Sequence, residues 1–157
     1  MEGKVALITG AGSGLGLATA WEFAKAGALV ALADWNLEEV TLAAEKLAAE
    51  GYKTLPIKCD VSDDAQVHDM VKRTVAHFGK LDYAYNNADV QNLLAEAADQ
   101  TIEDFERVNS INYRGIWSCM KYELQYMKQQ GSGAIVNCSS IGGIRAGAQR
   151  GVYHGAK

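Results

Sequence analysis

Tyr153 and Lys157, near the end of the chain, have types and a spacing that suit proton transfer. Residues four apart lie on one face of an α-helix, so the ammonium would approach the phenol. A nearby positive charge favours the phenolate, which can then exchange a proton near neutral pH. Ser140 comes earlier, just after an apolar run, where its hydroxyl could hydrogen-bond a substrate oxygen. Each feature alone is common by chance, so the prediction of an acid–base site depends on all three falling at one edge of a sheet.

A glycine-rich turn, TGAGSGLG at residues 9–16, joins an apolar run to a helical pattern. Such a turn lets backbone N–H groups approach a phosphate, and the helix N-terminus adds partial positive charge. Asp34 ends the next apolar run, where a carboxylate can accept hydrogen bonds from a ribose and would repel a 2′-phosphate. No Arg or Lys stands at Ser13, Trp35 or Asn36. The pattern therefore predicts NAD rather than NADP.

Two other interpretations of this loop stay open at this point. It could be a structural turn, with Asp34 an ordinary solvated acid. Gly10, Gly12 and Gly14 also resemble the first motif of methyltransferases that bind S-adenosylmethionine. A P-loop is excluded because no Gly-Lys-Ser/Thr follows.

The elements that would position these residues alternate along the chain. Apolar runs predict strands over residues 5–9, 29–33, 53–59, 81–86 and 134–139. Helical patterns predict helices over residues 15–26, 36–50, 62–78 and 101–130, with a further helix start at 152–157. Capping residues are expected at Asn36 (with Glu39), Ser62 and Thr101 (with Asp104). Strict alternation with near-continuous apolar strands predicts an α/β fold, a Rossmann-like doubly wound parallel sheet in three α/β/α layers, covered on both faces.

Composition restricts the classes of function. The 157 residues carry a net charge of −4 without a long basic tract, which argues against nucleic acid and anionic membranes as main partners. No apolar run is long enough to span a bilayer, and the N-terminal one is too short for a signal peptide. Cys59, Cys119 and Cys138 are scattered, as are the histidines, so we expect neither a disulfide framework nor a metal site. A cytoplasmic protein with one domain over residues 1–157 is expected.

Seven ordered motifs together resemble the classical short-chain dehydrogenase/reductase family. They are the loop TGAGSGLG, the acid Asp34, Cys59-Asp60-Val61, Asn86-Asn87-Ala88, Asn112 within SINYRG, Ser140 within CSSIGG, and Tyr153-His154-Gly155-Ala156-Lys157. The resemblance implies reversible hydride transfer between NAD(H) and a secondary alcohol or ketone, by a homodimer or homotetramer. The alternative is an NAD-binding fragment without turnover.

The resemblance also implies residue roles. Tyr153 would be the general acid/base, and Lys157 would favour its ionised form and bind the nicotinamide ribose. Ser140 would orient the substrate oxygen, and Asn112 would hold a water in a proton relay to Lys157. The implied cofactor-binding residues are Gly10, Ser13, Gly14, Leu15, Gly16, Asp34, Asp60, Val61, Asn86, Asn87 and Ala88, with Tyr153 and Lys157.

Two departures from the family pattern matter. Asp89 stands where the family has Gly, so a positive φ there would strain the chain. Its carboxylate would lie close to the cofactor cleft, which predicts weaker NAD binding or a shifted loop. The chain also ends at Lys157, so we expect it to be C-terminally incomplete, lacking the family's last strands and substrate loop. The sheet would then have an unpaired apolar edge. The mix of Leu93, Leu94, Ile144 and Arg145 predicts a mostly apolar alcohol or ketone as substrate.

Overall fold

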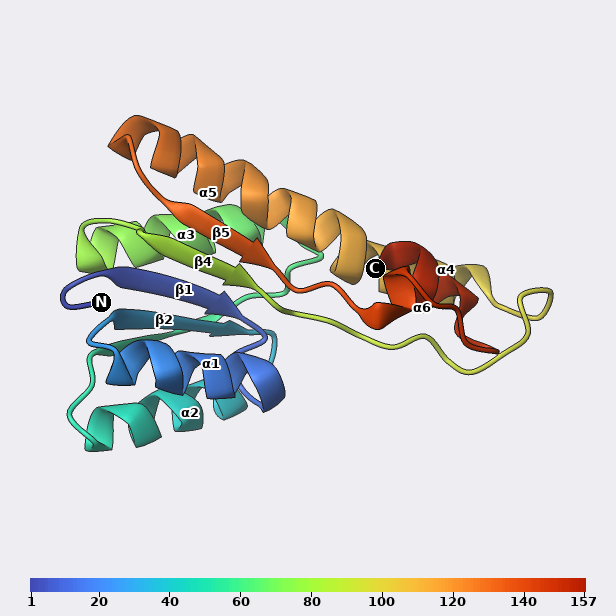
Figure 1. The fold of residues 1–157 in the computed structure, drawn as a ribbon, viewed down its shortest axis with the longest axis horizontal. Helices are drawn as coiled ribbons and strands as arrows, with labels where there is room; N and C mark the ends of the chain where they lie inside the picture. Colours follow the sequence, from blue (N-terminus) through green and yellow to red (C-terminus); the bar gives the residue numbers. More distant parts are fainter.

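The computed structural model describes residues 1–157 and alternates strands and helices in the predicted order (Figure 1). The strands are β1 (Val5–Thr9), β2 (Leu29–Asp34), β3 (Thr54–Lys58), β4 (Tyr83–Asn86) and β5 (Ala134–Asn137). The α-helices are α1 (Gly14–Lys25), α2 (Leu37–Ala49), α3 (Asp64–Phe78), α4 (Ile102–Asn109), α5 (Ile116–Gln130) and α6 (Gly151–Ala156). A π-helical segment η1 (Ser110–Gly115) and a 3-10 turn η2 (Ile141–Gly143) complete the set. None of these helices is both long and apolar enough to cross a bilayer.

The five strands form one parallel sheet in the order β3-β2-β1-β4-β5. The chain winds outward from β1 to β3, then crosses back to β4 beside β1. This reversal confirms the predicted doubly wound, Rossmann-like sheet. The carboxyl ends of β1 and β4 separate at the reversal, and ligands of such sheets bind there.

Two layers of helices cover the central strands (Figure 1). Helices α1 and α2 lie on one face, and α3 and α5 lie on the other. Successive strand residues point to opposite faces, so Leu7 joins the α3/α5 cluster and Ile8 joins the α1/α2 cluster. Both side chains are fully buried, and each burial contributes about 2 kcal/mol. The core therefore anchors β1, whose carboxyl end leads into the glycine loop.

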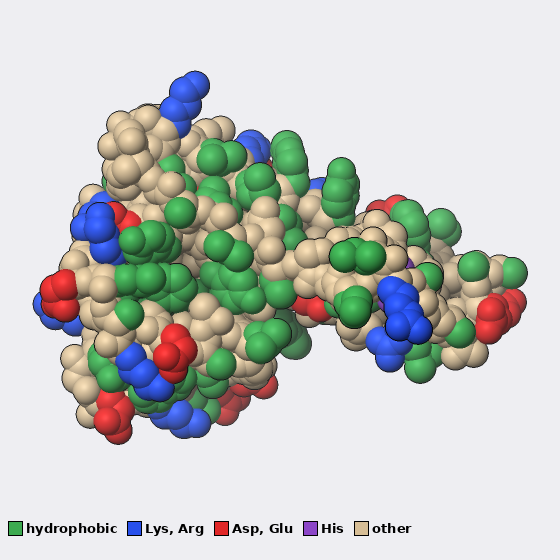
Figure 2. Space-filling model, viewed as in Figure 1, with side chains coloured by type: hydrophobic (Ala, Val, Ile, Leu, Met, Phe, Trp, Pro, Cys, Tyr) green, Lys and Arg blue, Asp and Glu red, His purple; other side chains and the backbone are tan.

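Strand β5 is an edge strand that is covered on one face only. Ile135 packs against the α3/α5 cluster, whereas Val136 points to the other face and is 60% exposed. Hydrophobic side chains gather on the viewed face of the molecule, where β5 and α5 lie (Figure 2). The expectation that helices cover both faces of the sheet is therefore wrong at β5. Helices α1 and α2 pack on β1 and β2 and reach as far as β4, which leaves this face of β5 open. The expected apolar sheet edge is present.

Two of the three predicted helix caps are confirmed. The side chain of Asn36 accepts hydrogen bonds from the backbone N–H groups of Glu38 and Glu39, and Thr101 accepts one from Asp104. The predicted cap at Ser62 is wrong, because Asp63 accepts from Ala65 at 2.9 Å and begins α3 one residue later. The backbone N–H and hydroxyl of Ser62 instead donate to Asp60, which holds Ser62 before the helix.

The long helix predicted over residues 101–130 is divided by η1. The division lies opposite Val61, where a β-carbon on Gly115 would be 2.9 Å from the Val61 Cγ2 atom. A π-helical insertion of this kind shifts the face that the following helix presents. It turns Asn112 inward, where the residue is 1% exposed.

A carboxylic acid, Glu123, is buried between α5 and the sheet with no exposed surface. Its Oε2 accepts a hydrogen bond from Asn86 at 3.0 Å, while its Oε1 and the Asn86 Oδ1 have no partner. Burial raises the pKa of Glu123 to about 7, against the opposing effect of the Asn86 hydrogen bond. The folded chain therefore binds this proton more tightly than the unfolded chain does.

We expect Glu123→Gln to remove a pH-dependent loss of stability. The stability that the proton contributes is full below about pH 4.5 and is lost as the pH rises to about 7, a change of about 3 kcal/mol. Between pH 5 and pH 8, the free energy of unfolding measured in urea should therefore fall by about 2–3 kcal/mol more in the parent than in the variant. Glu45→Gln, an exposed acid on α2, is the control and should gain nothing. Equal pH dependence in the parent and Glu123→Gln would contradict the prediction.

Candidate active site

A cleft of about 570 Å³ opens at the carboxyl ends of the strands, above the reversal between β1 and β4. Its walls come from the loops after β1, β2, β3 and β4 together with α4 and η1. The lining residues are Gly10, Ser13, Gly14, Leu15, Asp34, Trp35, Glu39, Cys59, Asp60, Val61, Asn87, Ala88, Asp89, Val90, Arg107 and Ile111. Nine of the predicted cofactor-binding residues are thus brought together in one cavity of a size that suits a small ligand.

The glycine loop has a backbone that side chains would disturb. Gly10 and Gly14 have φ values of +65° and +54°, which favour glycine. Gly16 lies beside the carbonyl group of Gly10, and a β-carbon on it would clash with that oxygen and lie 2.7 Å from the carbonyl carbon. Gly16 does not line the cleft, and its close packing lets α1 begin directly behind the loop. Its predicted contact with a cofactor stays a prediction.

Asp34 links the end of β2 to the glycine loop. Its Oδ2 accepts a hydrogen bond from Gly12 at 2.9 Å, and its Oδ1 accepts one from Asn36 at 3.0 Å. The residue is 7% exposed, and its exposed part faces the cleft. Each carboxylate oxygen accepts more than one hydrogen bond, so both retain capacity toward a ligand. Its role toward a ribose stays a prediction.

The loop after β3 adds Cys59, Asp60 and Val61 to the wall. The Asp60 carboxylate accepts from the backbone and hydroxyl of Ser62, which fixes the turn into α3. Burial raises the pKa of the Cys59 thiol to about 12, with nearby acids adding to the effect. The thiol therefore stays protonated, and nucleophilic catalysis by Cys59 is disfavoured.

Asn86, the last residue of β4, does not line the cleft, whereas Asn87 and Ala88 after it do. The amide of Asn87 donates to the Thr9 carbonyl at 3.2 Å, which ties this segment to the glycine loop. The side chain of Asn86 points into the α5 side of the sheet, where it donates to Glu123 and Asn137. The Asn86 side chain therefore faces away from the cleft, because neighbouring strand residues face opposite sides. The predicted cofactor contact of Asn86 stays a prediction.

Tyr153 and Lys157 meet a third residue, Asp89, at the end of the cleft. The Tyr153 hydroxyl donates to the Asp89 Oδ2 atom at 3.2 Å, and the Lys157 Nζ atom lies 3.3 Å from Asp89 Oδ1. Lys157 also donates to the carbonyl oxygen of Cys138 at 3.1 Å, and its side chain is 2% exposed. Its ammonium lies 5.8 Å from the centre of the Tyr153 ring. The predicted pair thus shares a helix face, with a carboxylate bridging its polar ends.

The backbone at Asp89 is not strained. The one non-glycine residue with a positive φ is Gln149, at 62°. The expectation of strain at Asp89 is therefore wrong, because the chain leaves β4 here without entering the left-handed region. The expected position of its carboxylate at the cleft is confirmed.

Ser140 and Asn112 form no side-chain hydrogen bond with Tyr153 or Lys157, although Asn112 and Lys157 line one small pocket beside α5. The Ser140 hydroxyl accepts from the Gly142 N–H at 3.0 Å and begins η2. The Asn112 amide forms two hydrogen bonds with the backbone of Val90, at 2.9 and 2.8 Å. It therefore holds the segment that carries Asp89, and its predicted role in a water relay stays a prediction.

The chain matches the family model described as short chain dehydrogenase over residues 4–157. It belongs to the short-chain dehydrogenase family. The methyltransferase alternative is therefore wrong, and the glycine loop and Asp34 are parts of a dehydrogenase-type sheet.

The chain aligns over almost its whole length with known short-chain dehydrogenases. A levodione reductase of Leifsonia aquatica is 40% identical over 98% of the chain, and the human 15-hydroxyprostaglandin dehydrogenase [NAD(+)] is 40% identical over 100% of it. The solved structure of an NAD+-bound xylitol dehydrogenase superposes on 99% of the chain with a TM-score of 0.96 and 36% identity. The chain spans 58% of each of the first two relatives and 60% of the third.

Five residues of this short-chain dehydrogenase cleft were not predicted to lie at a binding site: Trp35, Glu39, Val90, Arg107 and Ile111. Arg107 lies on α4, donates to the Gln91 carbonyl at 2.6 Å and pairs with Asp104 at 2.7 Å. No motif surrounds it, and only the return of α4 over the loop places it at the cleft.

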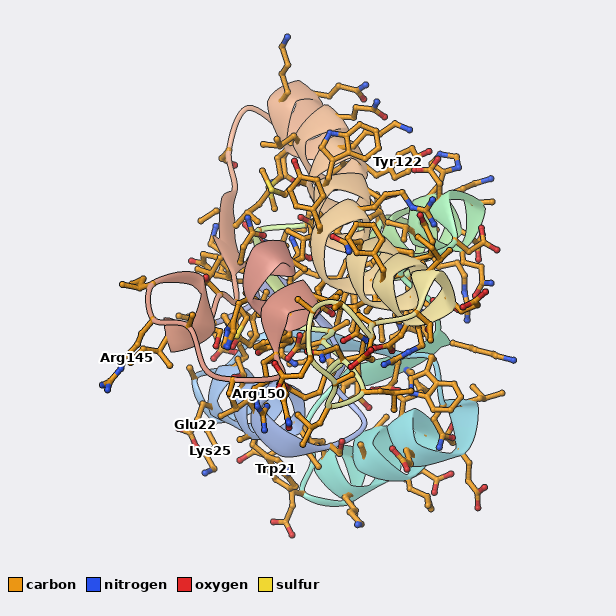
Figure 3. The ribbon with its side chains drawn as sticks, turned by 90° about the vertical axis from the view of Figure 1, so that its right-hand side faces the viewer. Trp21, Glu22, Lys25, Tyr122, Arg145 and Arg150 are labelled. Atoms are coloured by element: carbon orange, nitrogen blue, oxygen red, sulfur yellow. The ribbon has the colours of Figure 1, made fainter.

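Beyond the cleft, the loop between η2 and α6 is open to solvent, with Arg145 pointing away from the molecule (Figure 3).

Proposed function

We propose that this short-chain dehydrogenase transfers hydride reversibly between NAD(H) and a secondary alcohol or ketone. One observation carries the proposal: a cleft lined by the glycine loop and Asp34 ends at the Asp89 carboxylate, which contacts both Tyr153 and Lys157. A dinucleotide site and a proton donor therefore lie within reach of one substrate carbonyl group. Residues 1–157 would form a single dinucleotide-binding domain.

The residues of the cleft fit a dinucleotide. The glycine loop is packed closely against the segment after β4, since a β-carbon on Gly10 would lie 3.0 Å from the Cα atom of Ala88. The space beside Gly14 is open, and the N–H groups of the loop begin α1, as pyrophosphate binding requires. Asp34 is the acid at the end of β2 that would accept the ribose hydroxyls. Ser13, Gly14, Leu15, Asp60, Val61, Asn87 and Ala88 would form the remaining walls.

In the proposed reaction, the protein transfers a proton and orients the substrate but forms no covalent bond with it. When bound, the cofactor supplies the hydride chemistry. In ketone reduction Tyr153 gives its hydroxyl proton to the carbonyl oxygen, and in alcohol oxidation it takes that proton back. The Lys157 ammonium stabilises the phenolate left after donation. Ser140 would orient the substrate oxygen after its hydroxyl turns from Gly142, and Asn112 keeps the wall of the cleft in place.

A second candidate function is dinucleotide binding without turnover. The observation that favours it is the engagement of both Tyr153 and Lys157 by Asp89, because a substrate oxygen has to compete with this carboxylate for the phenol. Formation of NADH with a panel of secondary alcohols separates the two candidates. Turnover supports the first, and NAD+ binding without turnover supports the second.

We also propose a small, mostly apolar substrate and a cytoplasmic homo-oligomer. Leu93, Leu94 and Ile144 are exposed, and an apolar substrate would cover them. The three cysteines are free, as a reducing compartment favours. Exposed aromatic residues on and beside α5, Tyr113 and Trp117, offer a surface for a second copy. The net charge of −4 disfavours nucleic acid as a partner.

Cofactor choice gives a direct test at Asp34. We expect Asp34→Asn to reduce the preference for NAD+ over NADP+ by about 10- to 100-fold, since it removes the charge that repels a 2′-phosphate. The amide keeps one oxygen to accept from Gly12, so the loop is retained. Isothermal titration calorimetry with each cofactor measures the two Kd values. Glu38→Gln, an exposed acid on α2, is the charge-matched control. An unchanged preference would contradict the assignment of Asp34, and no binding to the parent would contradict the proposed function.

A further inference from the structure

Asp89 is the acidic residue of this cleft that contacts both members of the proposed acid–base pair. Its Oδ2 accepts from Tyr153 at 3.2 Å, and its Oδ1 lies 3.3 Å from the Lys157 ammonium. The Lys157 side chain is 2% exposed and that of Asp89 is 30% exposed. The ammonium is thus shielded from water, and its charge is balanced by Asp89 together with the Cys138 carbonyl. Arg107, the one cation among the residues that line the cleft, is paired with Asp104.

The proposed reaction determines where this pair lies relative to a bound cofactor. A proton donor and a hydride donor have to reach the same carbonyl group, which brings the nicotinamide ring close to the Tyr153 hydroxyl. Asp89 contacts that hydroxyl and lines the same cleft. The nicotinamide ring is positively charged in NAD+ and neutral in NADH. The charges of Asp89 and Lys157 therefore interact electrostatically with the ring of NAD+ but have no ring charge to interact with in NADH.

We propose that Asp89 is a positioning residue that holds the Tyr153 hydroxyl and balances the Lys157 ammonium, so that the cleft accepts the cationic NAD+. The inference rests on the proposed function. It differs from the expectation of weaker NAD binding, which was based on the closeness of the carboxylate to the cleft and stays a prediction. Lys157 lies beside Asp89, so removal of the Asp89 carboxylate leaves an unpaired ammonium next to the nicotinamide ring. The affinity for the cationic NAD+ then falls more than the affinity for NADH.

The test compares the Kd for NAD+ with the Kd for NADH in each variant, by isothermal titration calorimetry. The ratio used is the Kd for NAD+ divided by the Kd for NADH. Any loss of affinity that both forms share cancels in this ratio. Asp89→Asn is expected to raise the ratio about three- to tenfold, and Lys157→Met, which leaves the carboxylate unpaired, to lower it by a similar factor. Asp89→Glu restores the charge and should return the ratio toward that of the parent. Asp99→Asn, an exposed acid in the same connection, should leave the ratio within about twofold.

Lys157→Met keeps the test available if Asp89→Asn fails to fold, because Asp89 is partly solvated and still accepts from Tyr153 in that variant. A ratio that stays within twofold of the parent in the folded variants would overturn the inference and leave the proposed function standing. An unmodified chain that binds neither NAD+ nor NADH would overturn the proposed function, and the inference with it.

Discussion

A Tyr153→Phe variant is expected to lose a hundredfold or more of the rate at which a secondary alcohol is oxidised, while its Kd for NAD+ stays within about threefold. The change removes one oxygen atom and keeps the ring, which is 7% exposed and packed in α6. Without the hydroxyl, the phenol oxygen that donates to Asp89 is lost, and with it the proposed proton donor. General acid–base catalysis by one positioned group is worth about 10²–10⁴ in rate. NADH absorbance measures the rate, and calorimetry measures the affinity.

A hydroxyl removed elsewhere is the control for this result. Tyr126→Phe deletes a phenol oxygen whose hydrogen bond, to the Gly79 carbonyl, is 3.3 Å long and exposed. It should leave both the rate and the affinity unchanged. If Tyr153→Phe kept more than a tenth of the parent rate, Tyr153 would not be the proton donor, and the proposed mechanism would fail while cofactor binding stood.

Gly16→Ala is expected to destabilise the fold by about 2–3 kcal/mol and to weaken NAD+ binding about 30- to 100-fold. The added methyl group would clash with the carbonyl group of Gly10, and both belong to backbone that cannot move independently. Relief requires α1 to shift from the glycine loop, which would misdirect the N–H groups that are to hold the pyrophosphate. Urea unfolding and calorimetry measure the two effects.

The sign of this stability change separates packing from helix propensity. Alanine is the better helix former by about 1 kcal/mol, so propensity alone predicts that Gly16→Ala stabilises α1. Gly155, in α6, has no atom within 4 Å of a built β-carbon, and Gly155→Ala is expected to gain stability. A gain in both variants would show that the Gly10 carbonyl yields easily, and the packing role of Gly16 would be withdrawn.

Local patterns were sufficient to predict most of the elements. The run VALIT became β1 with the predicted bounds, and the Asn36 and Thr101 side chains cap the predicted helices. The cap at Ser62 was missed because Asp63 can perform the same hydrogen bonding one residue later. Apolar periodicity and capping act over a few residues, so they are readable without the rest of the molecule.

Side-chain direction at the ends of the strands was harder to predict. Asn86 and Asn87 are neighbours in one motif, yet Asn87 lines the cleft and Asn86 is buried against Glu123. The π-helical turn at η1 likewise rotates Asn112 onto the Val90 backbone. Motif matching assigns positions to a site, but the alternation of strand faces and the phase of a helix decide which atoms reach it.

The sequence by itself determined the alternating α/β order, the glycine loop with Asp34, and the pairing of Tyr153 with Lys157 on one helix face, because each depends on short-range spacing. Only the tertiary structure decided that Asp89 joins that pair, that Glu123 is buried with unpartnered oxygen atoms, and that β5 exposes Val136. These three outcomes depend on contacts between segments far apart in the chain. Their energies come from burial and charge pairing, which no local pattern encodes.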